Sequence, residues 1–203
     1  MTTNQSIQEC VSRIQQNGIR LVCFDFDQTA YRGHTGGALD LPVCDIIPAM
    51  HTMVSHLSQD FLTLVFELHN ENINVAIVTF GDAKYNEISL GNNKIVLGGD
   101  PLIRPVLTQG LNKETADKIP IYALNPDWRN GANGERPQFP DSKHWHMIMA
   151  MEHFSIHHPH QVLLVDDSNH NISEAASSGF HTVTVSPDTA FEVSQVLDHL
   201  KSP

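Results

Sequence analysis

The stretch IRLVCFDFDQT, residues 19–29, decides the fold of this chain. It begins with an apolar run that ends at Phe24, and it then places Asp25 and Asp27 two residues apart, with Thr29 two residues further on. A strand that is apolar at nearly every position is buried on both faces, which is typical of a parallel sheet covered by helices on both sides. The carboxylates at the end of such a strand need a functional explanation.

Other segments repeat this alternation of apolar strands and helices. Further strands are expected at 74–82, 119–125, 161–167 and 181–186. Helices are expected at 5–17, 47–70, 142–157, 169–178 and 188–200, with a short one from Asp82 and another opening at Asp100 and Pro101. The alternation predicts an α/β fold: a doubly wound, Rossmann-like parallel sheet of about five strands with helices on both faces.

The length favours one domain over residues 1–203. Small insertions are expected at 32–46, which starts with a glycine-rich loop, and within 82–118. The segment 125–140 has the composition of a long loop, in which Trp128 and Arg129 are candidate functional residues. Neither insertion has room for a large helical cap, so we expect a small lid or none and an open site.

Composition restricts the partners of the protein. Twelve basic and 23 acidic residues give a net charge of −11 without a basic cluster, which excludes bulk nucleic acid and an anionic membrane surface as partners. The chain has no signal-peptide pattern and no apolar run of roughly 18 residues, so we expect a cytoplasmic protein. Three cysteines without CxxC spacing are interpreted as reduced thiols. The oligomeric state stays open.

Polar residues gather where three of the expected strands end. They are Asp25 and Asp27 on the first, Thr79 and Gly81 on the second, and Asp166, Asp167 and then Asn171 on the fourth. Lys143 opens the helix before the fourth strand, 23 residues ahead of Asp166. The carboxyl ends of parallel strands share one edge of the sheet, where ligands bind, so these side chains should meet.

Crowded carboxylates repel one another unless a cation lies between them. Ligands that are all oxygen, without Cys or His, favour Mg²⁺ over zinc. A magnesium ion, a hydroxyl donor, a lysine and a further carboxylate are the groups that phosphoryl transfer requires. The sequence therefore predicts a Mg²⁺-dependent site for a phosphorylated substrate.

The chain resembles the haloacid dehalogenase superfamily of phosphatases, of the small-cap or capless type. The four short motifs of that superfamily occur in order as DFDQT (25–29), VAIVT ending at Thr79, Lys143, and LLVDDSNHN (163–171). Gln28 and Ala30 depart from the residues that are more common around the first motif. The motifs are short, but together they span the chain.

The resemblance implies a role for each motif residue. Asp25 would be the nucleophile that forms an aspartyl-phosphate, and Asp27 would act as general acid and base while its backbone carbonyl binds the metal. The phosphoryl oxygens would be held by Thr79 and by the backbone N–H groups of Phe80 and Gly81, and Lys143 would neutralise charge. The metal ligands would be Asp25, Asp27 and Asp167, with Asp166 direct or through water and Asn171 in support.

Some residues have more than one interpretation. Lys118 also precedes a strand and is an alternative to Lys143. His34, just beyond the first motif, either contacts substrate or belongs to a structural turn. A group of histidines at 144–160 includes His153 and His157, whose helical spacing can bind zinc, although surface positions fit the group better.

The leading hypothesis is a Mg²⁺-dependent phosphohydrolase acting on a phosphate monoester, in a small molecule or a phosphoprotein. A phosphotransferase or mutase, or a catalytically silent module that binds phosphorylated partners, stays an alternative. A receiver-type domain is disfavoured because its acidic pair leads in the chain, whereas here DFDQT leads. A glycosyltransferase with a DxD motif would leave Thr79 and Lys143 unexplained.

Overall fold

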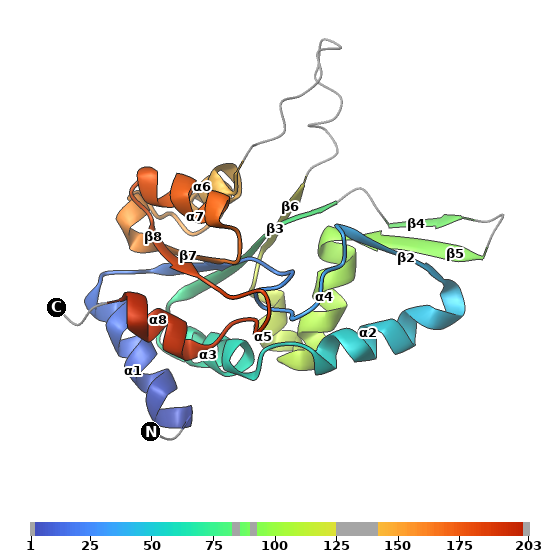
Figure 1. The fold of residues 1–203 in the computed structure, drawn as a ribbon, viewed down its shortest axis with the longest axis horizontal. Helices are drawn as coiled ribbons and strands as arrows, with labels where there is room; N and C mark the ends of the chain where they lie inside the picture. The colour runs from blue at the N-terminus through green and yellow to red at the C-terminus, as the bar shows by residue number, and fades with distance from the viewer. Residues whose placement is uncertain (1–2, 83–85, 90–92, 125–141, 201–203) are drawn as a thin grey trace, which may run out of the picture.

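The fold is described from a computed structural model over residues 3–82, 86–89, 93–124 and 142–200. Its centre is a parallel sheet in the order β6-β3-β1-β7-β8 (Figure 1). The strands are β1 (Leu21–Phe24), β3 (Asn74–Asp82), β6 (Ile121–Leu124), β7 (Val162–Asp166) and β8 (His181–Thr184). The chain runs from β1 outward to β6 and returns to β7 on the other side of β1, so the strand order reverses beside β1. The predicted doubly wound α/β sheet is confirmed.

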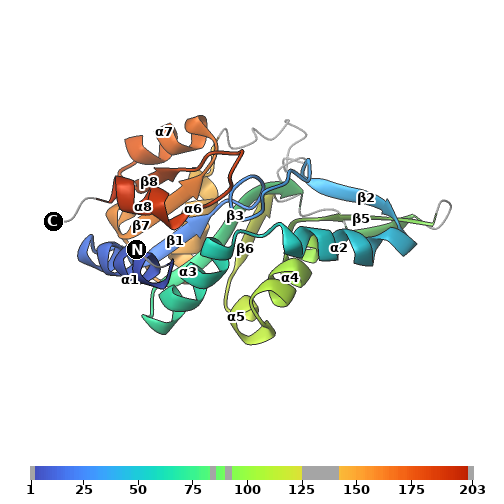
Figure 2. The same cartoon turned by 60° about the horizontal axis from the view of Figure 1, so that its bottom comes forward.

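Helices cover both faces of this sheet, as Figures 1 and 2 show. One face carries α1 (Thr3–Gln16), α3 (Gln59–Asn70), α4 (Gly99–Gly110), α5 (Lys113–Asp117) and α8 (Val193–His199). The other carries α6 (His144–His153) and α7 (Asn169–Ser177). The short turn η3 (Pro159–Gln161) links α6 to β7, and α7 leads into β8. No helix in the described ranges is long and apolar enough to cross a membrane.

The first strand shows why the apolar run had to be continuous. Val22 and Phe24 belong to the core beneath α1, α3 and α8, whereas Leu21 and Cys23 belong to the core beneath α6 and α7. All four are fully buried. Because neighbouring side chains of a strand point to opposite faces, a strand between two helical layers needs an apolar residue at each position.

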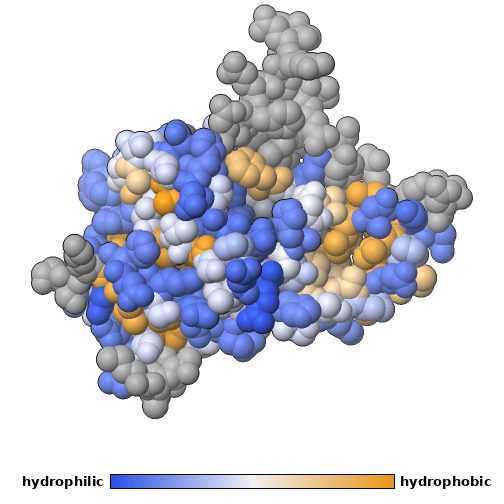
Figure 3. Space-filling view, viewed as in Figure 1, coloured by the Kyte–Doolittle hydropathy of each residue, from blue (hydrophilic) through white to orange (hydrophobic). Residues whose placement is uncertain are grey.

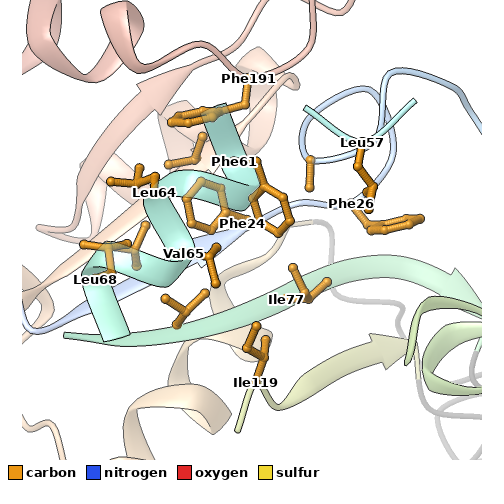
Figure 4. Packing of buried hydrophobic residues seen from close by; sticks show 14 of the residues in the cluster. Phe24, Phe26, Leu57, Phe61, Leu64, Val65, Leu68, Ile77, Ile119 and Phe191 are labelled. Carbon is orange, nitrogen blue, oxygen red and sulfur yellow. The ribbon is translucent and has the colours of Figure 1, made fainter. Parts of the chain in front are cut away.

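Aromatic packing holds the larger core together (Figure 4). The ring of Phe24 lies edge to face with Phe61 of α3, at 5.1 Å between centroids, and with Phe191 before α8, at 5.3 Å. Such geometry adds to the free energy gained by burial. These contacts join β1 to two later segments of the chain, and they fix the strand that leads into Asp25.

The helix expected at 47–70 is in fact two helices, α2 (Ile46–Ser55) and α3. Ser58 separates them, because its hydroxyl accepts a hydrogen bond from the Phe61 N–H at 3.1 Å and so caps α3. The same hydroxyl donates to the carbonyl of Phe191 at 2.6 Å. The apolar spacing continued across the break because Leu57 is buried there too, at 4% exposure.

Other expected boundaries were also wrong. The last helix was expected from 188 but begins at Val193. Glu192 and Gln195 form a capping box at this start. The helix after Lys143 ends at His153 instead of continuing to 157. Beyond it, Ser155 adopts a positive φ of 53°, which no helix continues through.

The two expected insertions form a small antiparallel sheet, which we call the arm. It consists of β2 (Ala38–Pro42), β5 (Lys94–Gly98) and β4 (Asn86–Ser89), in the order β2-β5-β4. The helix expected from Asp82 is therefore wrong, and the glycine-rich loop at the start of 32–46 gives way to a strand at Ala38. The turn η1 (Val43–Asp45) links β2 to α2. Figure 3 shows apolar residues gathered over the arm.

Phe61 and Phe66 form a matched pair for testing the core, because both lie on α3 but only Phe61 is buried; Phe66 is 48% exposed. We expect Phe61→Ala to lower the free energy of unfolding by about 3–5 kcal/mol, since it leaves a cavity against Phe24. Phe66→Ala should change it by about 0.5 kcal/mol. Urea unfolding followed by circular dichroism measures both, and similar losses would contradict this assignment of the core.

Candidate active site

The polar residues predicted at the strand ends meet in one pocket of about 410 Å³. Asp25 follows β1, Thr79 lies on β3, Asp167 follows β7, and Lys143 immediately precedes α6. The pocket lies at the carboxyl edge of the sheet, beside β1, where the strand order reverses. The topology thus brings together residues that are far apart in the sequence.

Lys143 is the centre of a buried charge cluster. Its ammonium lies 2.6 Å from Asp25 Oδ1 and 3.1 Å from Asp166 Oδ2, and it donates to the carbonyl of Val78 at 2.9 Å. The side chain is 1% exposed, and an ammonium group has three donors, so each donor has an acceptor. A lysine placed in this way is fixed in position, unlike a solvated surface lysine.

Asp166 is fully buried, and hydrogen bonds from the protein reach both of its oxygens. Ser168 N–H donates to Oδ1 at 2.8 Å, and the amide of Asn171 donates to both oxygens at 3.1 Å, in addition to the contact with Lys143. These bonds compensate the cost of burying the carboxylate. Asp167 is only half-buried and lines the pocket, so it is the more accessible of the two aspartates.

Three carboxylates converge closely enough to share one cation. Single oxygens of Asp25, Asp166 and Asp167 all lie within 4.8 Å of one another, and no other such group occurs within the described part of the chain. A set of carboxylate oxygens fits a hard divalent ion. Because Asp166 already accepts bonds at both oxygens, Asp25 and Asp167 are better placed for direct contact, with Asp166 behind them.

The electrostatics of the cluster follow from its burial. Burial raises the pKa of Asp25 to about 7, with Asp166 adding to the rise and Lys143 opposing it. Burial alone would lower the pKa of Lys143, but Asp25 and Asp166 outweigh that effect and raise it. Burial and the neighbouring Asp166 raise the pKa of Asp167 as well. The cluster is therefore short of positive charge, which a cation would supply.

Asp27 is held by the loop that leads to the arm. Its Oδ2 accepts hydrogen bonds from the backbone N–H of Thr35 at 2.8 Å and from the Thr35 hydroxyl at 2.7 Å, and His34 Nδ1 lies 3.1 Å from the same oxygen. The other oxygen, Oδ1, is buried without a hydrogen-bond partner. His34 lies in the pocket wall, where its contact is with Asp27, and its contact with substrate stays a prediction.

Thr35 was missed by the sequence reasoning. The available signal was a single hydroxyl residue set among glycines eight residues after Asp27, in the HTGG loop (34–37). Gly36 and Gly37 follow it with positive φ values of 68° and 92°, conformations that favour glycine. The loop thus turns sharply into β2 just after Thr35 has bound Asp27.

The second strand end supplies the remaining wall of the pocket. Thr79, Phe80 and Gly81 all line it. Thr79 is buried at 4% exposure, and its hydroxyl accepts a hydrogen bond from the Gly81 N–H at 3.2 Å. This places a hydroxyl and consecutive backbone amides beside Asp25 and Lys143, as predicted for this strand end.

Several candidates lie elsewhere or are not described. Lys118 is far from the pocket in the fold, near the start of β6, where it pairs with Glu114 at 3.0 Å. The histidines of 144–160 are not among the possible metal groups of the described residues. One of them, His146, is buried, contrary to the expected surface position, and burial lowers its pKa to about 3. Trp128 and Arg129 lie outside the described residues.

No protein-family model matches this chain, and no curated protein does. Solved structures with a similar arrangement include a haloacid dehalogenase-like family protein from Streptococcus pneumoniae, at 14% identity and a TM-score of 0.43, covering 90% of this chain and 91% of that one. A phosphoserine phosphohydrolase-like protein from Francisella tularensis has 12% identity and a TM-score of 0.41, with 82% and 87% covered. A predicted HAD-like family hydrolase from Porphyromonas gingivalis has 14% identity and a TM-score of 0.41, and the match covers 82% of this chain and 91% of that one. At these values the similarities assign no activity to this chain.

The raised pKa of Asp25 predicts that protons and a divalent cation compete for the cluster. Below about pH 7 the carboxyl gains a proton, so the affinity for Mg²⁺ should fall about tenfold from pH 8 to pH 6 and level off above pH 8. Calorimetric titration with MgCl₂ measures this. Asp25→Asn serves as the control, because it removes the titrating group and should flatten the profile. Equal affinities of the unaltered protein at pH 6 and pH 8 would contradict the assignment.

Proposed function

We propose that this chain is a phosphohydrolase of the haloacid dehalogenase type, which cleaves a phosphate monoester through an aspartyl-phosphate on Asp25. The observation that carries the proposal is the meeting of Asp25, Lys143 and Asp167 in one pocket, with Asp27 in its wall. Their meeting supports the proposal because the sequence separates the first and last of them by more than half the chain.

In the first step, a carboxylate oxygen of Asp25 attacks phosphorus and the bond from phosphorus to the leaving oxygen breaks. Lys143 holds Asp25 in place by the 2.6 Å ion pair and neutralises the negative charge that the phosphate brings. Thr79 and the backbone N–H groups of Phe80 and Gly81, which line the pocket, would donate to the phosphoryl oxygens. For Gly81 this requires its N–H to exchange the present 3.2 Å bond to the Thr79 hydroxyl for one to the phosphate. Asp27 gives its proton to the leaving oxygen as an alcohol departs.

In the second step, water hydrolyses the aspartyl-phosphate. Asp27, now a carboxylate, takes a proton from the water as the oxygen of that water bonds to phosphorus and the bond from phosphorus to Asp25 breaks. Inorganic phosphate leaves and Asp25 is restored. The same residue serves as acid and then as base because it is ready for the second role once the first is complete.

The residues that would hold a magnesium ion are Asp25 and Asp167 through their carboxylates and Asp27 through its backbone carbonyl, with Asp166 and Asn171 behind them. Bound there, the ion would offset the charge of the phosphate and of the carboxylates. Lys143 supplies one positive charge against the three carboxylates of Asp25, Asp166 and Asp167, so a divalent cation would balance the remaining negative charge.

Substitution of the two first-motif aspartates separates their roles. Asp25→Asn should lower the hydrolysis of an aryl phosphate at least about 10³-fold, because the nucleophile is lost. Asp27→Asn should also abolish most turnover but keep Mg²⁺ affinity within about twofold, since its side chain is not a ligand here. Colorimetric release of phosphate, with and without EDTA, measures both. Full activity of Asp25→Asn, or activity in chelator, would refute the mechanism.

The hydrogen bond from Thr35 predicts a role in placing Asp27. Thr35→Val keeps the shape and the backbone N–H but removes the hydroxyl that donates at 2.7 Å. We expect kcat to fall about tenfold with KM little changed, because one hydrogen bond to a charged group is lost at the acid and base. Thr35→Ser should restore kcat. Steady-state kinetics test this, and an effect confined to KM would show that Thr35 binds substrate instead.

A further inference from the structure

Phe80 is the one apolar side chain among the described residues that line the catalytic pocket. The other lining residues are charged, polar or glycine. Its side chain is 37% exposed, and it belongs to the residue whose backbone N–H we place next to the phosphoryl group. The carbon skeleton of a leaving group therefore has one apolar surface to meet as it extends from the phosphate.

The ring of Phe80 is held in place from within the protein. The ammonium of Lys143 lies 5.1 Å from the ring centroid, and the ring of His146 packs edge to face at 5.5 Å. Both partners are buried, so the exposed part of the ring is directed away from them. A ring fixed in this way offers a preorganised surface, which loses little conformational freedom when a ligand binds.

The cation beside the ring bears on which ligand fits. The positive charge of Lys143 attracts the π electrons of the Phe80 ring toward the face that it contacts, in a cation–π interaction. The opposite face is then a better partner for an electron-rich ring, such as a phenol that gains negative charge as its bond to phosphorus breaks. Gly36 and Gly37 in the pocket wall carry no side chains that would fill the space for a flat group.

A second partly exposed aromatic residue lies outside the pocket and shares a ring partner with Phe80. Trp145 is also 37% exposed, and its ring lies 5.9 Å from that of His146, the residue whose ring packs against Phe80. Trp145 also lines a separate cavity of about 330 Å³ with Tyr122. A leaving group large enough to extend past Phe80 to Trp145 would meet this second ring.

We propose that the site selects phosphate esters whose leaving group is an aromatic ring, and that the side chain of Phe80 is the residue that determines this specificity. The proposal deepens the proposed function and rests on it for the identity of the phosphate pocket. An aryl phosphate can be a free small molecule or a phosphorylated tyrosine in a protein, and both present the same ring to Phe80.

Phosphonates test this without turnover. Calorimetry in the presence of Mg²⁺ compares phenylphosphonate with cyclohexylphosphonate, which has similar bulk but no aromatic face. We expect the protein to bind phenylphosphonate about 3- to 10-fold more tightly. Phe80→Leu should remove this preference and change cyclohexylphosphonate affinity less than about twofold, whereas Phe80→Tyr should keep the preference. Mg²⁺ affinity and circular dichroism confirm that each variant is folded.

The outcomes separate this inference from the proposed function. Equal affinities for the two phosphonates, or a preference that survives in Phe80→Leu, would overturn the role of Phe80 and leave the phosphohydrolase proposal intact. Binding of neither phosphonate would overturn both. A short peptide that carries the phosphonate analogue of phosphotyrosine distinguishes the sources: tighter binding than phenylphosphonate, weakened by Trp145→Leu, assigns a protein substrate, and weaker binding assigns a small molecule.

Discussion

The structure depends on one buried ion cluster, in which Lys143 lies between Asp25 and Asp166 at 2.6 and 3.1 Å. Charges removed from water are costly unless they are paired and hydrogen-bonded, so the fold must bring all three to the same point together. The parallel sheet does this, because β1 and β7 are neighbours and end at the same edge. The core around Phe24 fixes the end of β1, and the chemistry of the pocket follows from it.

The centre of the molecule was predictable because burial on two faces leaves a strong pattern. Residues 162–165 of β7 are all apolar and fully buried, as a strand between two helical layers requires. The motif residues were predictable for a related reason, since polar groups directly after a buried strand must lie at its edge. The sequence favoured Lys143 over Lys118, and the fold shows the first lysine buried and the second exposed.

The arm and the helix boundaries were not predictable in the same way. Strands β2 and β5 are short and only partly buried, so their composition resembles that of a loop. The close approach of Gly98 to the carbonyl of Asp82, where a Cβ would lie at 2.2 Å, depends on tertiary structure that no local pattern contains. Ser58 divided a continuous apolar stripe because its hydroxyl bonds Phe191, a contact across most of the chain. Thr35 was missed because its hydrogen bond to Asp27 depends on the shape of the loop between them, which the sequence pattern does not show.

The most direct test of the account is to trap the covalent intermediate on Asp25. Brief incubation with an aryl phosphate and Mg²⁺, followed by borohydride, reduces an acyl phosphate to an alcohol, and peptide mass spectrometry locates the change. Homoserine is expected at position 25 and nowhere else, and only when both substrate and Mg²⁺ are present. Modification of another residue, or hydrolysis that proceeds with position 25 unaltered, would contradict the claim that the buried cluster exists to hold a nucleophile.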